Sequence, residues 1–287
     1  MVAFWLSILR KRYVCEEYLF LPPNMPTVRC PKCHHARAWK LRRQRLKCKR
    51  CRSEFGGVVY PVVGFRVSTD EWTVCIRTFL RERTIRRVTE ETNRSHCLVE
   101  RMVMHLRVRM ASDVRGRCAG PVEMDETYIG GQRKNKRLHI RRIGAKKGHG
   151  TDKLPIVGVY DRPTGTVLVF VEPRKLDIAF IIRTLKTHTV AGAKVYTDGF
   201  KMYRSLSTHG FFHAYIDHDG GEYVRGDVHT NNIEGFWGIM KRKLGCIGGM
   251  QRKYLHLFVA EIVWKFNHRH LSLKDQERML AVLILGS

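Results

Sequence analysis

Two short acidic segments stand out in a chain that is otherwise strongly basic. One reads VEMDETYIGG at residues 122–131, the other reads HTNNIEGFW at residues 229–237, and YTDG at residues 196–199 lies between them. The chain has 53 Lys and Arg against 26 Asp and Glu, a formal net charge of +27. Such a surface suits a polyanion, and carboxylates within it suit Mg²⁺, which binds carboxylate and phosphate oxygens. The combination predicts chemistry on a nucleic-acid phosphodiester.

The cysteines indicate a second metal site. Cys30 and Cys33 form one CxxC pair, Cys48 and Cys51 form another, and fourteen residues separate the pairs. Four thiolates in this pattern can bind one structural Zn²⁺ tetrahedrally. His34 and His35 could replace one thiolate, but we expect them to lie outside the metal site.

The segment around these cysteines is basic without interruption. Residues 29–52 contain eleven Lys and Arg and no Asp or Glu. A solvated surface usually mixes charges, so a run of one sign predicts contact with phosphates. The candidate DNA-binding residues here are Arg42, Arg43, Arg45, Lys47 and Lys49.

The composition of the chain limits the class of protein and the compartment in which it can lie. Over 287 residues, a hydrophobic content of 44% can form a true core. No apolar stretch is long enough to span a membrane. In the N-terminal segment the apolar run precedes the basic residues, the reverse of a signal peptide. Nine cysteines, four of them in CxxC pairs, favour metal and free thiols in a reducing compartment. We therefore expect a location in the cytoplasm or nucleoid of a bacterium, or in a nucleus, and no secretion.

Residues 68–112 are predicted to be helical. Ser68 and Glu71 form a capping-box pattern, residues 84–92 could form a second helix, and Ser95 can cap a third. Two helices joined by a short turn are compatible with a helix-turn-helix DNA reader, although a plain linker bundle fits nearly as well. The candidate DNA contacts here are Arg86, Arg87, Arg94 and Arg101.

From about residue 118 the pattern changes to strands. Residues 122–129 alternate, which places Glu123, Asp125 and Thr127 on one face and Glu126 on the other. A hairpin is expected over residues 156–172, a helix after Asp177, and strands at 193–197 and 212–216. Two helices, at about 232–244 and 255–267, are expected to close the chain. This order predicts a mixed sheet with helices on its faces, at whose edge Asp125, Asp198 and Glu234 could meet.

A basic segment interrupts this region after the first strand. Residues 133–147 hold eight Lys and Arg and no acidic residue. We interpret residues 132–150 as an inserted loop or arm. Its candidate DNA contacts are Lys134, Lys136, Arg137, Arg141 and Arg142.

These motifs together resemble the ISXO2-like transposases of the IS1595 group and their eukaryotic relatives, the Merlin elements. The resemblance rests on VEMDETYIGG, YTDG, HTNNIEGFWGIMKR and the FNHR at residues 266–269. It covers nearly the whole chain, because a zinc knuckle and a helical segment precede the catalytic domain in that family. It implies an α/β chain with an RNase H-like mixed-sheet catalytic domain. The implied organisation is an N-terminal segment 1–28, a zinc ribbon 29–60, a helical segment 68–112, the catalytic domain 118–270 and a C-terminal tail 271–287.

The resemblance also implies the chemistry. Asp125, Asp198 and Glu234 would be the DDE triad and would bind two Mg²⁺ or Mn²⁺ ions, and Lys241 would lie near the DNA end. The expected partners are double-stranded DNA, as terminal inverted repeats and as target, and further copies of the chain when two ends are brought together. His229, Asn231 and Arg242 are additional candidate DNA contacts, and a structural role for His229 is equally compatible.

Alternatives remain at the site and for the whole chain. Glu123 is a weaker candidate metal ligand, whereas Glu126 is expected to face away from the site. A domesticated, catalytically inert DNA-binding protein would carry the same zinc ribbon and helices. An RNase H-like nuclease would cut DNA without joining it.

Overall fold

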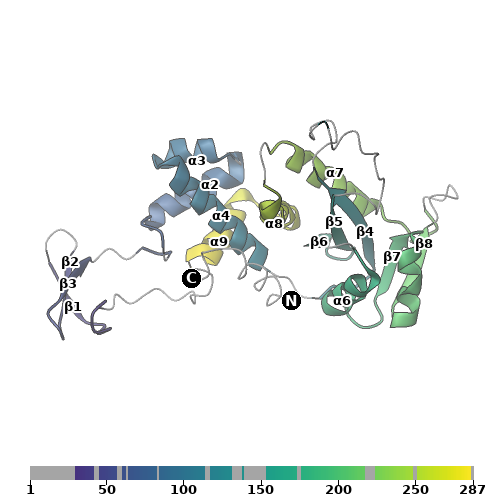
Figure 1. The fold of residues 1–287 in the computed structure, drawn as a ribbon, viewed down its shortest axis with the longest axis horizontal. Coiled ribbons are helices and arrows are strands. Elements are labelled where there is room, and N and C mark those ends of the chain that lie inside the picture. Colours follow the sequence, from purple (N-terminus) through teal and green to yellow (C-terminus); the bar gives the residue numbers. More distant parts are fainter. Residues whose placement is uncertain are drawn as a thin grey trace. The chain divides into compact units, whose positions relative to one another are not determined.

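The computed structural model describes residues 30–41, 45–56, 60–62, 64–82, 84–113, 117–130, 138, 153–172, 176–216, 224–247 and 251–285. The chain divides into two compact units, one formed by residues 1–113 with 271–287 and the other by residues 114–270 (Figure 1). The expected N-terminal segment and, apart from residue 138, the basic segment 132–150 lie outside the described residues. No helix in the described ranges has the length and apolarity needed to cross a membrane.

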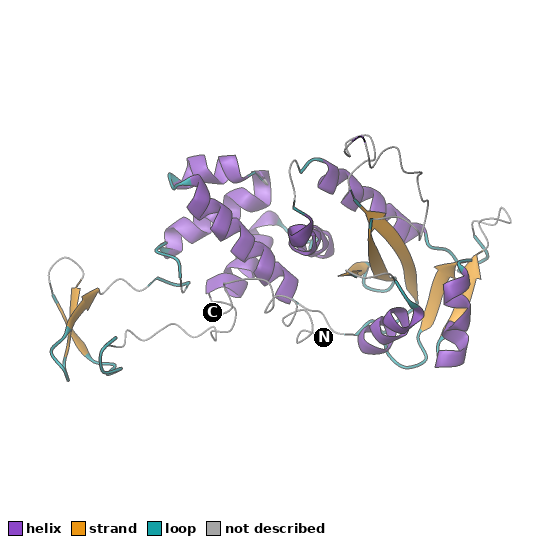
Figure 2. Ribbon diagram, in the orientation of Figure 1, coloured by secondary structure: helices purple, strands orange, loops and turns teal. Residues whose placement is uncertain are grey.

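The first unit begins with a small antiparallel sheet. Its strands are β1 (Ala38–Lys40), β2 (Arg45–Cys48) and β3 (Glu54–Gly56), in that order, and they are drawn in orange in Figure 2. Cys30 and Cys33 precede β1, whereas Cys48 ends β2. The sheet therefore brings together two cysteine pairs that are far apart in sequence.

Three helices follow, and two of them begin at the expected capping residues, Ser68 and Ser95. In α2 (Thr69–Glu82), Ser68 and Glu71 bond each other's backbone N–H groups at 3.3 and 2.8 Å, as a capping box does. Thr84 caps α3 (Ile85–Thr92) and Ser95 caps α4 (His96–Ser112). The apolar residues buried in these helices include Trp72, Phe79, Val88, Met102 and Leu106.

A further helix corrects the expectation that only two helices follow the sheet. α9 (Leu273–Leu285) occupies residues that were expected to be a tail, and it packs against α2 and α4. Glu277 forms ion pairs with Arg77 and Arg81 of α2 at 3.3 and 3.7 Å. Leu280 and Ile284, one turn apart, are buried. The end of the chain therefore returns to the first unit.

The second unit is a mixed α/β structure. Its sheet has the order β6-β5-β4-β7-β8. β4 pairs antiparallel with β5, and β5 pairs antiparallel with β6, whereas β4 pairs parallel with β7 and β7 with β8. The strands are β4 (Val122–Ile129), β5 (Leu154–Asp161), β6 (Thr166–Val171), β7 (Lys194–Asp198) and β8 (Phe212–Ile216).

Helices cover both faces of this sheet. On one face, α7 (Asn231–Gly245) and α8 (Leu255–Asn267) form an apolar cluster with Ile156 and Val167. On the other face, Phe170 of β6 contacts His188 of α6 (Ile178–His188). A 3-10 helix, η4 (Lys201–His209), follows β7 and contacts β8 and α6. The expected order of strands and helices over residues 122–267 is confirmed.

Candidate active site

Asp125 and Asp198 lie on neighbouring parallel strands. Asp125 is in the middle of β4, and Asp198 is the last residue of β7. The register pairs Glu123 with Tyr196, and Asp125 and Asp198 each lie two residues further along their strands. Since alternate residues of a strand share a face, both aspartates belong to the face that carries Glu123.

The electrostatics of this pair show a concentration of negative charge. Burial, together with the charges of Glu126 and Asp198, raises the pKa of Asp125 to about 7. Burial and the charge of Asp198 also raise the pKa of Glu126 to about 7, although Glu126 accepts a hydrogen bond from the buried hydroxyl of Tyr203. A divalent cation would offset this repulsion and restore the charged form of the carboxylates.

Trp237 of α7 holds Asp125 from the helical side. The indole Nε1 donates a hydrogen bond of 2.9 Å to Asp125 Oδ2. The ring lies against Gly158 of β5, the residue paired with Asp125, where an added Cβ would come within 2.6 Å of two ring carbons. Gly158 therefore allows the indole to approach the sheet closely enough to reach the carboxylate.

α7 also carries Glu234, in its first turn. The Glu234 side chain is exposed, and its Oε1 accepts a hydrogen bond of 2.7 Å from Thr230 Oγ1. Lys241 is exposed two turns further along the helix. The two residues therefore lie on one helix beside the strand that carries Asp125.

Strand alternation left Glu123 open as a weaker candidate metal ligand. In the structure its carboxylate has other partners. It is completely buried. Its Oε2 accepts the backbone N–H groups of Asn232 and Ile233 at 2.9 and 3.1 Å, and its Oε1 accepts the Asn232 side-chain amide and Arg162 Nε, both at 2.7 Å. Both oxygens are therefore committed to α7 and Arg162.

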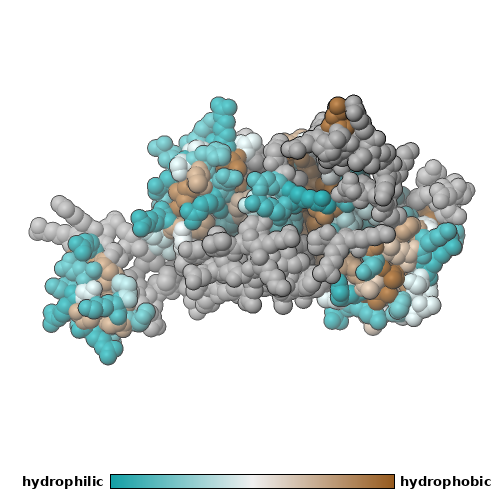
Figure 3. Space-filling model, in the orientation of Figure 1, coloured by the Kyte–Doolittle hydropathy of each residue, from teal (hydrophilic) through white to brown (hydrophobic). Residues whose placement is uncertain are grey.

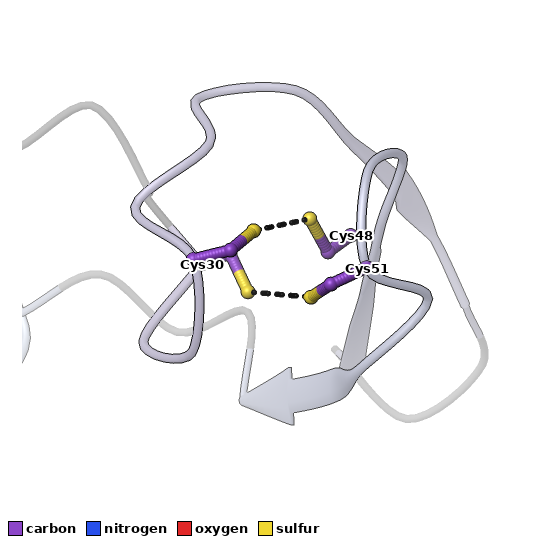
Figure 4. A group of neighbouring side chains, drawn as sticks. Cys30, Cys48 and Cys51 are labelled. Atoms are coloured by element: carbon purple, nitrogen blue, oxygen red, sulfur yellow. Dashed lines mark hydrogen bonds between the residues drawn. The ribbon is translucent and has the colours of Figure 1, made fainter.

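The four paired cysteines converge in the first unit. Their sulfur atoms lie within 4.8 Å of one another, with Cys30 Sγ 3.4 Å from Cys51 Sγ and Cys33 Sγ 3.5 Å from Cys48 Sγ (Figure 4). Tetrahedral zinc–thiolate sites require a spacing of about 3.8 Å between sulfurs. Burial opposes ionisation of Cys48, but the backbone N–H groups of Cys51 and Arg50 and the neighbouring thiols lower its pKa, whereas burial and the same thiols raise the pKa of Cys51. The donors therefore fit a Zn²⁺ ion.

Elsewhere in the described chain, no other group of three or more Cys, His, Asp or Glu side chains is so closely clustered. Asp125, Asp198 and Glu234 are accordingly more widely spaced than the cysteines. Ligands around two metal ions about 4 Å apart would also be more widely spaced than those around a single ion.

The basic residues expected to bind DNA have varied surroundings. Arg45 and Lys47 are 3.5 and 4.0 Å from Glu54, and Lys49 and Arg52 lie over the ring of Trp39. Hydrophilic residues predominate on the visible face of this small sheet, at the far left of Figure 3. The acidic partner and the aromatic ring on this surface were not anticipated from the run of positive charge.

The helical candidates are also paired. Arg86 and Arg87 form ion pairs with Glu90, and Arg87 with Glu91 as well. Arg94 donates to Glu71 at 2.6 Å, and Arg101 donates to the Gly64 carbonyl at 3.2 Å. The surface of α3 therefore mixes charges, as a solvated helix does.

The remaining candidates divide between described and undescribed residues. Asn231 and Arg242 are exposed on α7, whereas His229 Nδ1 lies 3.3 Å from Glu123 Oε1. The other seven lie outside the described residues: Arg42, Arg43, Lys134, Lys136, Arg137, Arg141 and Arg142.

Sequence reasoning did not single out Arg162, Gly158 or Trp237. Arg162 was considered only as part of a hairpin turn, and Trp237 only as part of a motif. The role of the Trp237 indole N–H could not be predicted from the sequence of α7 alone, because its acceptor, Asp125, is on a strand more than 100 residues earlier. Glu126 was expected to face away from the site; it accepts a hydrogen bond from Tyr203 of η4, and the charge of Asp198 contributes to its raised pKa.

Comparison with known proteins identifies the family. A model of the ISXO2-like transposase domain matches residues 117–267, which includes the whole sheet and α6 to α8. A protein of transposable element ISH50 from Halobacterium salinarum, described as uncharacterized, is 32% identical over 225 residues, covering 74% of each chain. The chain therefore belongs to the ISXO2-like transposases of the IS1595 group.

A solved structure also aligns with this chain, but weakly. It is a cryo-EM structure of a simian T-cell lymphotropic virus intasome in complex with PP2A regulatory subunit B56 gamma. The alignment covers 67% of each chain with a TM-score of 0.33 and 11% sequence identity.

Proposed function

We propose that the chain is an active DDE transposase whose second unit is an RNase H-like catalytic domain. It would bind the terminal inverted repeats of its element, cleave the DNA at the ends and join the 3′-OH ends to target DNA. The observation that carries the proposal is the placement of Asp125 and Asp198 on adjacent parallel strands, with α7, which bonds Asp125 through Trp237 and carries Glu234 in its first turn, packed on the same face. The sheet, with three antiparallel strands followed by two parallel ones, supports this fold.

Asp125, Asp198 and Glu234 would hold two Mg²⁺ or Mn²⁺ ions. When bound, such ions activate water and stabilise the leaving oxygen in an in-line displacement at phosphorus. Burial and neighbouring carboxylates raise the pKa of Asp125 to about 7, and a bound divalent cation would favour its charged form.

The other residues would position the reactants. Trp237 fixes the orientation of the Asp125 carboxylate through one of its oxygens. Lys241 presents a cation two turns from Glu234, where it would contact the phosphate backbone of the DNA end. The four-cysteine ribbon would bind Zn²⁺ structurally and, with the helix-turn-helix-like segment α3–α4, would contribute DNA binding.

The experiment removes one metal ligand at a time. Asp125→Asn, Asp198→Asn and Glu234→Gln keep the side-chain shape but remove a negative charge. Each should abolish Mg²⁺-dependent cleavage and joining on a duplex that carries the DNA flanking the coding region, while binding to that duplex is retained. The losses should be non-additive in double variants, because the carboxylates act as one unit.

The same assay separates the alternatives. Wild-type protein that binds this DNA but never cuts it would be a domesticated DNA-binding protein. Cleavage without any strand-transfer product would indicate a nuclease. Wild-type rates in Glu234→Gln would refute the triad.

A further inference from the structure

Glu123 and the partly exposed Arg162 form an ion pair on the sheet that carries the proposed triad. Glu123 is 0% exposed, and Arg162 Nε donates to its Oε1 at 2.7 Å. Arg162 follows the last residue of β5, in the turn that leads to β6. Its guanidinium also lies over the ring of Tyr196, 4.5 Å from the centroid. The pair therefore joins β4 to the hairpin, and its cation stacks on β7.

The same two side chains hold the segment that leads into α7. Arg162 Nη1 donates to the Asp227 carbonyl at 2.6 Å, and Nη2 donates to the His229 carbonyl at 2.8 Å. Glu123 accepts two backbone N–H groups in the first turn of the helix, those of Asn232 and Ile233. These N–H groups have no partner within a helix and carry its positive dipole, so a carboxylate is the side chain that satisfies them best.

The position of this carboxylate on the strand matters for the site. Glu123 and Asp125 share one face of β4 and both reach α7, the first at the helix N-terminus and the second through Trp237. Glu234 directly follows Ile233, whose N–H Glu123 accepts. Any shift of the helix N-terminus would therefore move Glu234 relative to Asp125.

We propose that Glu123 and Arg162 are positioning residues that hold the start of α7, and thereby Glu234, in register with Asp125 and Asp198. This inference rests on the proposed catalytic function. It predicts that the pair affects metal binding and the rate of cleavage, without itself touching metal or DNA.

Two variants weaken the attachment in different ways. Glu123→Gln keeps the shape but places an amide N–H₂ group among donors, so at least one bond to α7 is lost. Arg162→Lys keeps the charge but cannot reproduce three bonds that diverge from one guanidinium. Each should lower the cleavage kcat about 10- to 100-fold and raise the Mn²⁺ concentration for half-maximal activity, as changes to residues that orient metal ligands do. The KM for DNA should stay unchanged.

Readouts without turnover complete the test. Mn²⁺ binding, followed by electron paramagnetic resonance, should weaken in both variants in parallel with the activity requirement. In Glu123→Gln, hydrogen exchange at the amides of Asn232 and Ile233 should be faster than in the wild type.

The chain offers two matched controls. Glu261→Gln breaks another ion pair, the buried 2.7 Å contact with Lys265 within α8. Arg269→Lys changes another arginine that bonds the same hairpin: Arg269, just after α8, donates to the Gly165 and Phe266 carbonyls at 2.9 and 2.8 Å. Assayed well below their unfolding temperatures, both should keep the wild-type kcat and Mn²⁺ requirement.

The outcomes distinguish the two proposals. If Asp125→Asn abolishes cleavage and the Glu123 and Arg162 variants lose metal affinity while the controls do not, the positioning role stands. If Glu123→Gln fails to fold, Arg162→Lys decides alone. If both variants match the controls, the positioning role is overturned while the triad remains. If Asp125→Asn cleaves normally, the proposed function itself fails.

Discussion

Asp125 depends on two neighbours that contribute no charge. Trp237 donates to its carboxylate, and Gly158 leaves the space in which the indole lies. The hydrogen bond selects one orientation of a carboxylate whose charged form is disfavoured. Gly158 on β5 therefore allows Trp237 of α7 to reach the carboxylate of Asp125 on β4.

Replacement of Gly158 by Ala should harm both folding and activity. The new Cβ would lie 2.6 Å from ring carbons of Trp237, which is 4% exposed and has little room to move. Overpacking of this kind costs about 1–3 kcal/mol of unfolding free energy. Cleavage should fall more than in Trp237→Phe, which loses the N–H but creates no clash. Denaturant unfolding and single-turnover cleavage would measure both effects.

Gly238→Ala is the control for this substitution. Gly238 is exposed on α7, and an added Cβ would meet nothing within 4 Å. This change should be neutral or should stabilise the helix by up to about 1 kcal/mol. Equal losses in the two alanine variants would contradict the role assigned to Gly158.

The carboxyl groups of Asp125 and Glu126 should make stability depend on pH. The folded-state pKa of each is raised to about 7, so the folded chain keeps protons that the unfolded chain has lost. The stability that these two carboxyl groups contribute is fully present below their pKa in the unfolded chain. It is lost as pH rises through about 7. In EDTA, the unfolding temperature of the second unit should therefore fall between about pH 5 and about pH 8.

Mg²⁺ should reverse this trend, because cations compete with protons for the same oxygens. The rise in unfolding temperature on adding Mg²⁺ should be larger at about pH 8 than at about pH 5.5. Scanning calorimetry of wild type and Asp125→Asn would test this, and the variant should show a smaller rise. A rise independent of pH in the wild type would refute a carboxylate origin.

Among the structural elements, the ribbon of β1 to β3 is stabilised by its four paired cysteines more than by an apolar core. Its strands have three or four residues each, too few to form an independent apolar interior. Cys33→Ser should therefore reduce the zinc content by one ion per chain and unfold the ribbon, because a structural zinc site contributes folding free energy directly. Elemental analysis of purified protein would measure the loss. Cys97→Ser, at an exposed free cysteine of α4, should leave zinc content unchanged.

Elements with strong local signals were predictable from sequence. The Ser68, Ser95 and Asp177 caps each begin a helix in the structure. α8 has the predicted bounds, because an apolar stripe runs along its full length. Local rules succeed here because each cap bonds a backbone group only three residues away.

Other features were not predictable, because their partners are distant in sequence. α9 has its own start signal, since Ser272 bonds both the backbone and the side chain of Asp275, but the helices that it packs against, α2 and α4, lie far earlier in the chain. The sequence could not decide whether Glu123 binds metal. Its actual partners include backbone N–H groups of α7, 109 residues later. Alternation gives the face of a strand but not what covers that face.

For the whole molecule, the excess of positive charge can bind DNA in two ways. Particular Lys and Arg side chains can contact phosphates, or the net charge can attract DNA without specific contacts. A net charge of +27 draws in any polyanion, so affinity alone cannot locate the DNA-binding surface. The dependence of affinity on salt can do so. Each phosphate that a Lys or Arg neutralises releases counterions and adds about 0.9 to the slope of log K against log salt.

The last prediction uses this slope. A variant with Arg45, Lys47 and Lys49 changed to Gln should flatten it by about 1 for each side chain that contacts a phosphate. Its control removes the same formal charge from the other part of the first unit, by changing Arg77, Arg81 and Arg278 to Gln. These three lie on α2 and α9, outside the ribbon and outside the proposed DNA-binding segment α3–α4, and should leave the slope nearly unchanged. Fluorescence anisotropy with a labelled duplex at several salt concentrations would measure both slopes. If the two triple variants flatten the slope equally, binding follows net charge, and the ribbon is not the DNA-contacting surface.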